Sequence, residues 1–372
     1  MGNKQIKGPL RSRSADARGS VLRALRRKDR GLPPPKATSD SDLQGNEVSS
    51  PQGPPGRSSR ERSSRSFCLK AAGRSFSLSP HPLFLRIADI SIAVHSKDPD
   101  FKIKMDEDTK KFLLTQADPD VRVEAGWGNN SKNSVGKKIF DSGVLWQLYA
   151  DDCSYRFYFT TTTLGPVPYK IARFDREFKS GEVFFHRPYF PSGPPLYPLD
   201  YPLDEILIAN ILARGKGVEV HGCGVVDAQG KGRLFIGKSG AGKTTMARLW
   251  QNQPGVMVLS DDRIILRQLE DRLWMYGTPW HGEANLASPD RVPLTKVYFL
   301  SKGIKNELFP LGGCDAAGRL LACSFPPFYS QQGLDFTLSF LEEIVRAIPC
   351  YELKFLPDEE VLGFILKKGH PS

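Results

Sequence analysis

Apolar and polar residues alternate in short runs through residues 81–201, and this period of two predicts β-strands rather than helices. Residues 144–149 and 155–161 flank Asp151 and Asp152, an arrangement typical of a hairpin with an acidic turn. The two carboxylates could instead bind a metal, but a turn is the favoured interpretation. We expect a β-rich N-terminal domain here. Further strands are predicted at residues 87–94, 167–174 and 182–185.

Helical and strand periods alternate after residue 202, as expected of an α/β domain over residues 202–372. Strands at 218–226 and 233–236 are separated only by a short turn, so they should be antiparallel and the sheet should be mixed. A wide apolar face predicts a helix at 203–213. Further helices are expected at 245–250, 336–347 and 358–366, and further strands at 256–260, 264–269, 272–276, 295–300 and 351–355.

The charge of the chain is concentrated at its start. The net charge is +11, and residues 1–80 hold 17 of the 52 Lys and Arg residues but only 6 of the 41 acidic ones. The remaining chain therefore has 35 residues of each sign. We expect no nucleic-acid partner for the folded part, since its charge is balanced.

Residues 1–80 are rich in Arg, Ser, Pro and Gly, a composition that predicts a disordered tail. Three roles stay open: an organellar transit peptide, an electrostatic arm for anionic partners, or an extension without function. No apolar run is long enough to cross a membrane, and the six cysteines form no C-x-x-C pair. These features favour a cytoplasmic protein with free thiols, a homo-oligomer being one option.

A glycine-rich segment carries the clearest chemistry. It matches the phosphate-loop pattern G-x-x-x-x-G-K-S/T, and it lies between a predicted strand and a predicted helix. Glycines let successive backbone N–H groups turn toward a phosphate, and the helix N-terminus adds partial positive charge. The predicted nucleotide-binding residues are Gly237, Lys238, Ser239, Gly240, Ala241, Gly242, Lys243, Thr244 and Thr245.

Side chains around this loop have the types needed for phosphoryl transfer. Lys243 should reach the β- and γ-phosphates of ATP, and the Thr244 hydroxyl should face Mg²⁺. Asp261 and Asp262 end a predicted strand, with Asp261 eighteen residues after Lys243, which is Walker-B placement. We predict that Asp262 binds Mg²⁺ with Thr244 and that Asp261 accepts the proton of an attacking hydroxyl.

Three further polar residues are candidates for the same site. His221 lies on the strand that should return beside the phosphate loop, so we predict that it is catalytic with Lys243 and Asp261. His281 and Glu283 belong to a loop with Trp280 and have either a functional or a packing role.

His221, the phosphate loop and the Asp261–Asp262 pair together resemble HPr kinase/phosphorylase and its relatives. That resemblance implies the P-loop kinase fold of HPr kinase/phosphoenolpyruvate carboxykinase type, with a mixed β-sheet. It also implies an active site built from the His, the loop Lys and the Asp pair, with ATP and Mg²⁺ as cofactors. The expected acceptor is a hydroxyl, typically of Ser, on a peptide, protein or small molecule.

Two other functions remain open. One is a phosphoenolpyruvate carboxykinase-like enzyme, and the other is a non-catalytic module that binds a peptide in a nucleotide-dependent way. The binding module would need the loop but neither His221 nor Asp261.

Overall fold

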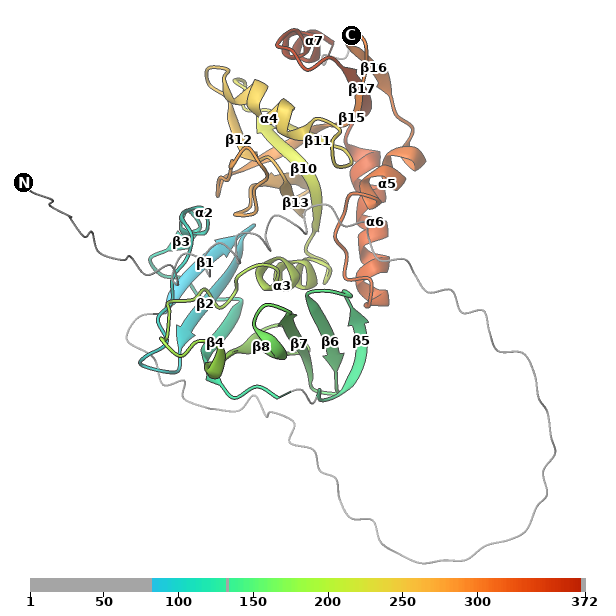
Figure 1. Ribbon diagram of the computed structural model, residues 1–372. Coiled ribbons are helices and arrows are strands. Elements are labelled where there is room, and N and C mark those ends of the chain that lie inside the picture. Colours follow the sequence, from blue (N-terminus) through green and yellow to red (C-terminus); the bar gives the residue numbers. More distant parts are fainter. Residues whose placement is uncertain (1–81, 132–133, 369–372) are drawn as a thin grey trace, which may run out of the picture. The chain divides into compact units, whose positions relative to one another are not determined.

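The computed structural model describes residues 82–131 and 134–368, which fall within one compact unit (Figure 1). The predicted tail, residues 1–80, lies outside the described residues. The described chain is a mixed α/β protein with two large mixed sheets. The division into domains at 201/202 stays a prediction.

The first sheet has nine strands in the order β3-β1-β2-β4-β9-β8-β7-β6-β5. Only the pairs β2–β4 and β4–β9 are parallel. The strands are β1 (Leu83–Ile87), β2 (Ile90–Ser96), β3 (Leu113–Leu114), β4 (Val121–Gly128), β5 (Lys137–Asp141), β6 (Trp146–Ala150), β7 (Ser154–Thr161), β8 (Gly165–Asp175) and β9 (Ser180–His186). The short helix α2 (Glu107–Lys110) lies between β2 and β3 in the chain, and the short helix η2 (Arg187–Tyr189) follows β9.

Two details of this sheet test the sequence pattern. The hairpin predicted around Asp151 is confirmed as β6 and β7, and the Asp151 carboxylate accepts the backbone N–H groups of Cys153 and Ser154 at 3.0 and 2.8 Å. The single strand predicted at 87–94 is wrong. Ala88 and Asp89 have φ of 48° and 56°, so the chain turns there and forms the β1–β2 hairpin.

The second sheet has eight strands and contains the phosphate loop. They are β10 (Val218–Val226), β11 (Gly232–Ile236), β12 (Met257–Ser260), β13 (Arg263–Leu269), β14 (Arg272–Tyr276), β15 (Arg291–Lys302), β16 (Glu307–Pro310) and β17 (Cys350–Phe355). Strand β10 is antiparallel to β11, as predicted, and β11 is parallel to β15. Because β10, β13, β14 and β15 also pair in succession, these five strands close into a ring.

Five helices accompany the second sheet: α3 (Leu203–Leu212), α4 (Lys243–Gln251), α5 (Gly313–Leu321), α6 (Gln331–Ala347) and α7 (Glu360–Lys368). Helices α5 and α6 pack on the core that contains Val220 and Leu234, and α4 and α7 pack on the core that contains Phe235. Burial of apolar surface contributes about 25 cal/mol per Å², so this packing is the main stabilising contribution.

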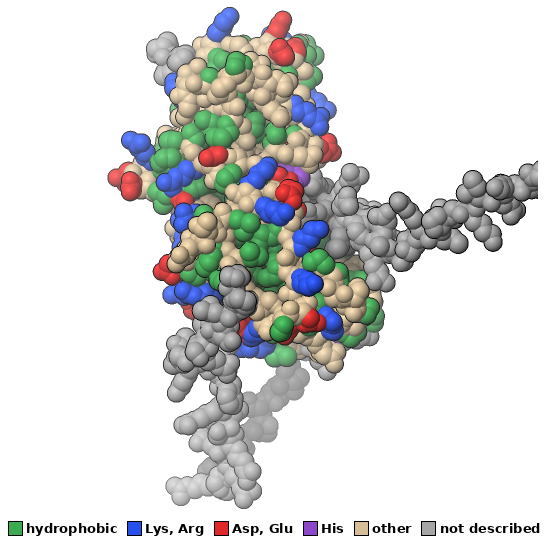
Figure 2. Space-filling model, turned by 90° about the vertical axis from the view of Figure 1, so that its left-hand side faces the viewer, with side chains coloured by type: hydrophobic (Ala, Val, Ile, Leu, Met, Phe, Trp, Pro, Cys, Tyr) green, Lys and Arg blue, Asp and Glu red, His purple; other side chains and the backbone are tan. Residues whose placement is uncertain are grey.

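Helix α3 buries Leu203, Leu207 and Ile208 in the core of the first sheet, and Ile265 and Tyr276 of the second sheet join the same core. After the helix, Gly215 has φ 87°, and Gly217 lies so close to Leu266 that a Cβ would sit 2.3 Å from its carbonyl oxygen. Glu205 on α3 lies beside the start of β13, where its Oε1 accepts a hydrogen bond from Arg263 Nε at 2.7 Å. Figure 2 shows one face of the molecule, where basic, acidic and hydrophobic side chains are interspersed.

Candidate nucleotide and phosphoryl-transfer site

The phosphate loop connects β11 to α4. Gly242 precedes the helix at φ 105°, and a Cβ on it would lie 2.6 Å from the Phe355 ring. Both facts require glycine at this position. Lys238, Ser239 and Gly240 are exposed, so the outer side of the loop is open to solvent. Their backbone N–H groups and those of the first turn of α4 are available to bind phosphate.

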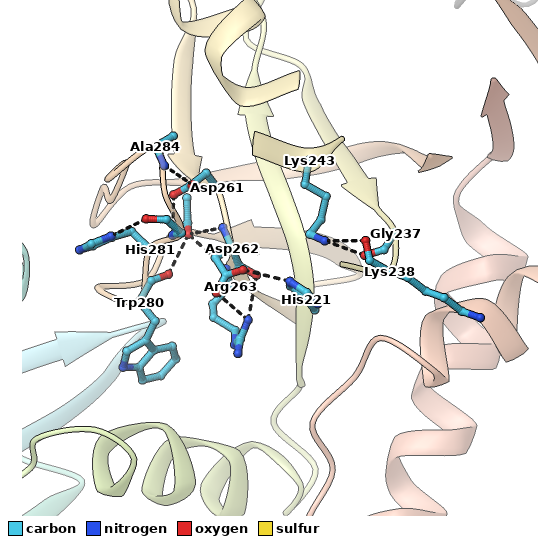
Figure 3. A network of polar contacts seen from close by, with 12 residues as sticks. His221, Gly237, Lys238, Lys243, Asp261, Asp262, Arg263, Trp280, His281 and Ala284 are labelled. Atoms are coloured by element: carbon cyan, nitrogen blue, oxygen red, sulfur yellow. Dashed lines mark hydrogen bonds and ion pairs between the residues drawn. The ribbon is translucent and has the colours of Figure 1, made fainter. Parts of the chain in front are cut away.

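Lys243 is the first residue of α4 and is buried, with 7% of its surface exposed. Its ammonium donates hydrogen bonds to the carbonyl oxygens of Gly237 at 2.7 Å and Lys238 at 3.2 Å (Figure 3). Burial lowers the pKa of Lys243, and the negative charge of Asp262 opposes that shift. The lysine therefore lies within electrostatic reach of Asp262, as a phosphate-binding lysine must.

Asp262 and His221 form a hydrogen-bonded pair. The register of β10 with β13 places His221 opposite Arg263, and His221 Nε2 lies 3.0 Å from Asp262 Oδ1 (Figure 3). Burial alone would raise the pKa of Asp262. The bond with His221 and the charges of Arg263 and Lys243 outweigh it and hold that pKa well below the usual range. The carboxylate is therefore ionised at neutral pH.

Burial also sets the protonation state of His221. It lowers the pKa of the imidazole below 6.5, helped by the charges of Lys243 and Arg263, although the bond with Asp262 opposes it. The ring is therefore neutral at pH 7. A neutral ring that donates Nε2–H to Asp262 carries its free lone pair on Nδ1, where it can accept a proton.

Asp261 lies in a different environment from its neighbour. It is 1% exposed, and both carboxylate oxygens are occupied by backbone donors of one loop. Oδ1 accepts the N–H of Gly282 at 2.8 Å and that of Leu286 at 3.4 Å, while Oδ2 accepts the N–H of Ala284 at 2.9 Å. These contacts favour a role in anchoring this loop, and they favour Asp262 as the carboxylate that serves the reaction.

The loop after β14 carries Trp280, His281 and Glu283. Trp280 donates its indole N–H to Asp204 at 2.7 Å, and His281 Nε2 lies 2.9 Å from Asp108 Oδ2. Glu283 is exposed. The structure thus brings His221, Lys243 and Asp262 together, whereas His281 contacts Asp108 of α2 and the Gly282 carbonyl of its own loop.

Sequence reasoning missed a segment between α5 and α6. Its Cys323 carbonyl accepts the His221 N–H at 2.6 Å, and the Phe325 N–H donates to the Glu219 carbonyl at 3.0 Å. Residues 323–325 thus run beside β10 where β11 has ended. This pairing joins positions about a hundred residues apart, so no local pattern indicates it.

The donor set suits Mg²⁺ that arrives with a nucleotide. No group of three or more His, Cys, Asp or Glu residues in 82–131 and 134–368 could hold a metal ion by itself. Mg²⁺ commonly takes one or two carboxylates and completes its shell with phosphates and water. The ionised Asp262 and the half-buried Thr244 are donors of that kind.

Comparisons with known proteins add little to this geometry. No family model matches the chain, and no curated protein matches it. The HPr(Ser) kinase/phosphatase from Coxiella burnetii is a similar solved structure, with 12% identity and a TM-score of 0.25. The similarity covers 41% of this chain and 95% of that chain. It is a distant structural relation, and no property of the site is inferred from it. Among the described residues, no helix is long and apolar enough to span a membrane.

Proposed function

We propose that this chain is a Mg-ATP-dependent phosphotransferase that moves the γ-phosphoryl group to a hydroxyl of a peptide, protein or small molecule. One observation carries the proposal. A phosphate-loop lysine lies within electrostatic reach of an ionised carboxylate that is hydrogen-bonded to a neutral imidazole. Positioning and charge stabilisation account for most of phosphoryl-transfer catalysis, so these are the groups that the reaction needs.

Each group has a defined part in the proposed reaction. The N–H groups of the loop and of the first turn of α4 bind the phosphate oxygens, and Lys243 donates to the β- and γ-phosphates. Thr244 and Asp262 would hold Mg²⁺, which neutralises phosphate charge when bound. The acceptor hydroxyl loses its proton to the His221–Asp262 pair, at Nδ1 of His221, as its oxygen bonds to phosphorus and the bond to the ADP oxygen breaks.

This assignment changes one role from the sequence-based prediction. The sequence pattern predicts Asp261 as the proton acceptor, but its carboxylate oxygens already accept hydrogen bonds from three backbone N–H groups. We therefore assign Asp261 to holding the loop of residues 277–286. His221 takes over the proton, because burial keeps its imidazole neutral and leaves a free lone pair on Nδ1.

Transfer of label from γ-labelled ATP tests this function, with Ser-containing peptides and proteins as acceptors and ATP consumption as a second measure. Wild type should turn over with Mg²⁺, and Lys243→Ala should not. Lys231→Ala is the matched control, because Lys231 is exposed in the turn before β11. Nucleotide binding without any turnover would contradict the phosphotransferase and favour a nucleotide-dependent binding module.

A further inference from the structure

Arg263 is the first residue of β13 and directly follows the Asp pair. Its guanidinium donates from Nη1 to Asp262 Oδ2 at 2.7 Å and from Nε to Glu205 Oε1 at 2.7 Å. Glu219 Oε1 lies 3.4 Å from the same Nε, and the ring of Phe325 covers the guanidinium at 4.3 Å. One side chain therefore joins α3, β10, β13 and the segment after α5.

The contacts of Asp262 are divided between its two oxygens. Oδ1 faces His221, and Oδ2 faces Arg263 (Figure 3). A carboxylate held at both oxygens cannot rotate freely, so the plane of the Asp262 carboxylate is set by two partners. The guanidinium is suited to this task because its planar fork donates in two fixed directions at once.

Arg263 is itself held by acidic groups behind it. Its side chain is 12% exposed, as is that of Glu205 on α3, and that of Glu219 is fully buried. Burial, followed by the negative charge of Glu205, raises the pKa of Glu219, so this carboxyl favours its neutral form. Glu205 is then the main ionic anchor of the guanidinium.

We propose that Arg263, anchored by Glu205, is a positioning residue that sets the orientation of the Asp262 carboxylate for the Mg-nucleotide. The part that concerns Mg²⁺ rests on the proposed function. Outer-shell partners of a metal ligand commonly contribute 10- to 100-fold to metal affinity or activity. Arg263 should act on the metal-dependent part of nucleotide binding and not on the contacts of the phosphate loop.

Arg267 provides a matched control on the same strand. It lies on the same face of β13 and is also buried. Its guanidinium donates to the carbonyl oxygens of Lys216, at 3.0 Å, and Ala88, and these are backbone groups outside the site. A substitution of Arg267 therefore reports the general cost of changing a buried arginine in this sheet.

Calorimetric titration with a non-hydrolysable ATP analogue is done once in Mg²⁺ and once in EDTA. The difference separates the metal-dependent part of nucleotide binding from the contacts of the phosphate loop. Arg263→Lys keeps the charge but lacks the planar fork that donates in two fixed directions, so it should reduce the Mg²⁺-dependent gain in affinity about tenfold or abolish it. Its affinity in EDTA should stay within about twofold of wild type. Glu205→Gln should reduce the gain in the same direction, and Arg267→Lys should leave it unchanged.

The outcomes separate this inference from the proposed function. If wild type does not bind the analogue, the phosphotransferase and the positioning role both fail. If wild type shows a Mg²⁺-dependent gain and both Arg263→Lys and Glu205→Gln keep it, only the positioning role is overturned. If Arg263→Lys does not fold, Glu205→Gln decides alone, because it keeps Arg263 and weakens only its anchor.

Discussion

Replacing Asp261 by Asn should loosen the loop of residues 277–286. The Asn side chain has one acceptor oxygen, so it can keep the Gly282 and Leu286 bonds but must turn its NH₂ group toward the Ala284 N–H. A hydrogen bond to a charged group contributes about 1.5–3 kcal/mol. Loss of the Ala284 bond should therefore lower the free energy of unfolding by about that amount.

Urea denaturation gives the free energy of unfolding, and amide hydrogen exchange at Gly282 and Ala284 gives the local effect. Asp262→Asn is the matched comparison. It should leave exchange in the loop unchanged and weaken Mg²⁺-dependent nucleotide binding, since Asp262 contacts His221 and Arg263 instead.

One result would refute the anchoring role of Asp261. If Asp261→Asn has wild-type stability and wild-type exchange but phosphoryl transfer falls by about 10²–10⁴, Asp261 is the proton acceptor after all. A variant with both a looser loop and slower transfer agrees with our assignment when transfer recovers under conditions that stabilise the loop.

Three further variants test the site. Lys243→Ala should weaken Mg-ATP binding by about 1.5–3 kcal/mol with the fold intact, and equal affinities by calorimetry would contradict this. Because the pKa of His221 is lowered, wild-type turnover should be constant above pH 6.5 and fall at lower pH as the ring protonates. Any residual turnover of His221→Asn should lack this decrease at low pH. The raised pKa of Glu219 means that wild-type stability is fully present below the usual carboxyl pKa and falls as pH rises toward the raised value. Glu219→Gln should remove this slope of up to about 1.36 kcal/mol per pH unit, and identical slopes in urea unfolding would refute the interpretation.

The local sequence was enough to predict the phosphate loop and its immediate surroundings. Strand β11, the loop and α4 are contiguous, and the glycines, Lys243 and the flanking apolar runs each act within a few residues. The antiparallel pairing of β10 with β11 was also predictable, because the short turn between them leaves the chain little other choice. In the same way, the acidic turn at Asp151 follows from hydrogen bonds between near neighbours in the chain.

Only the tertiary structure decided which Asp faces which partners. Asp261 and Asp262 lie in the bend between β12 and β13, so the pair could be divided in either way until the partners were placed. The loop after β14 occupies both oxygens of Asp261, and β10 brings His221 to Asp262 from 41 residues away. The positions of Arg263 and Phe325 depend on contacts across 58 or more residues, and local propensity carries no signal for contacts of that kind.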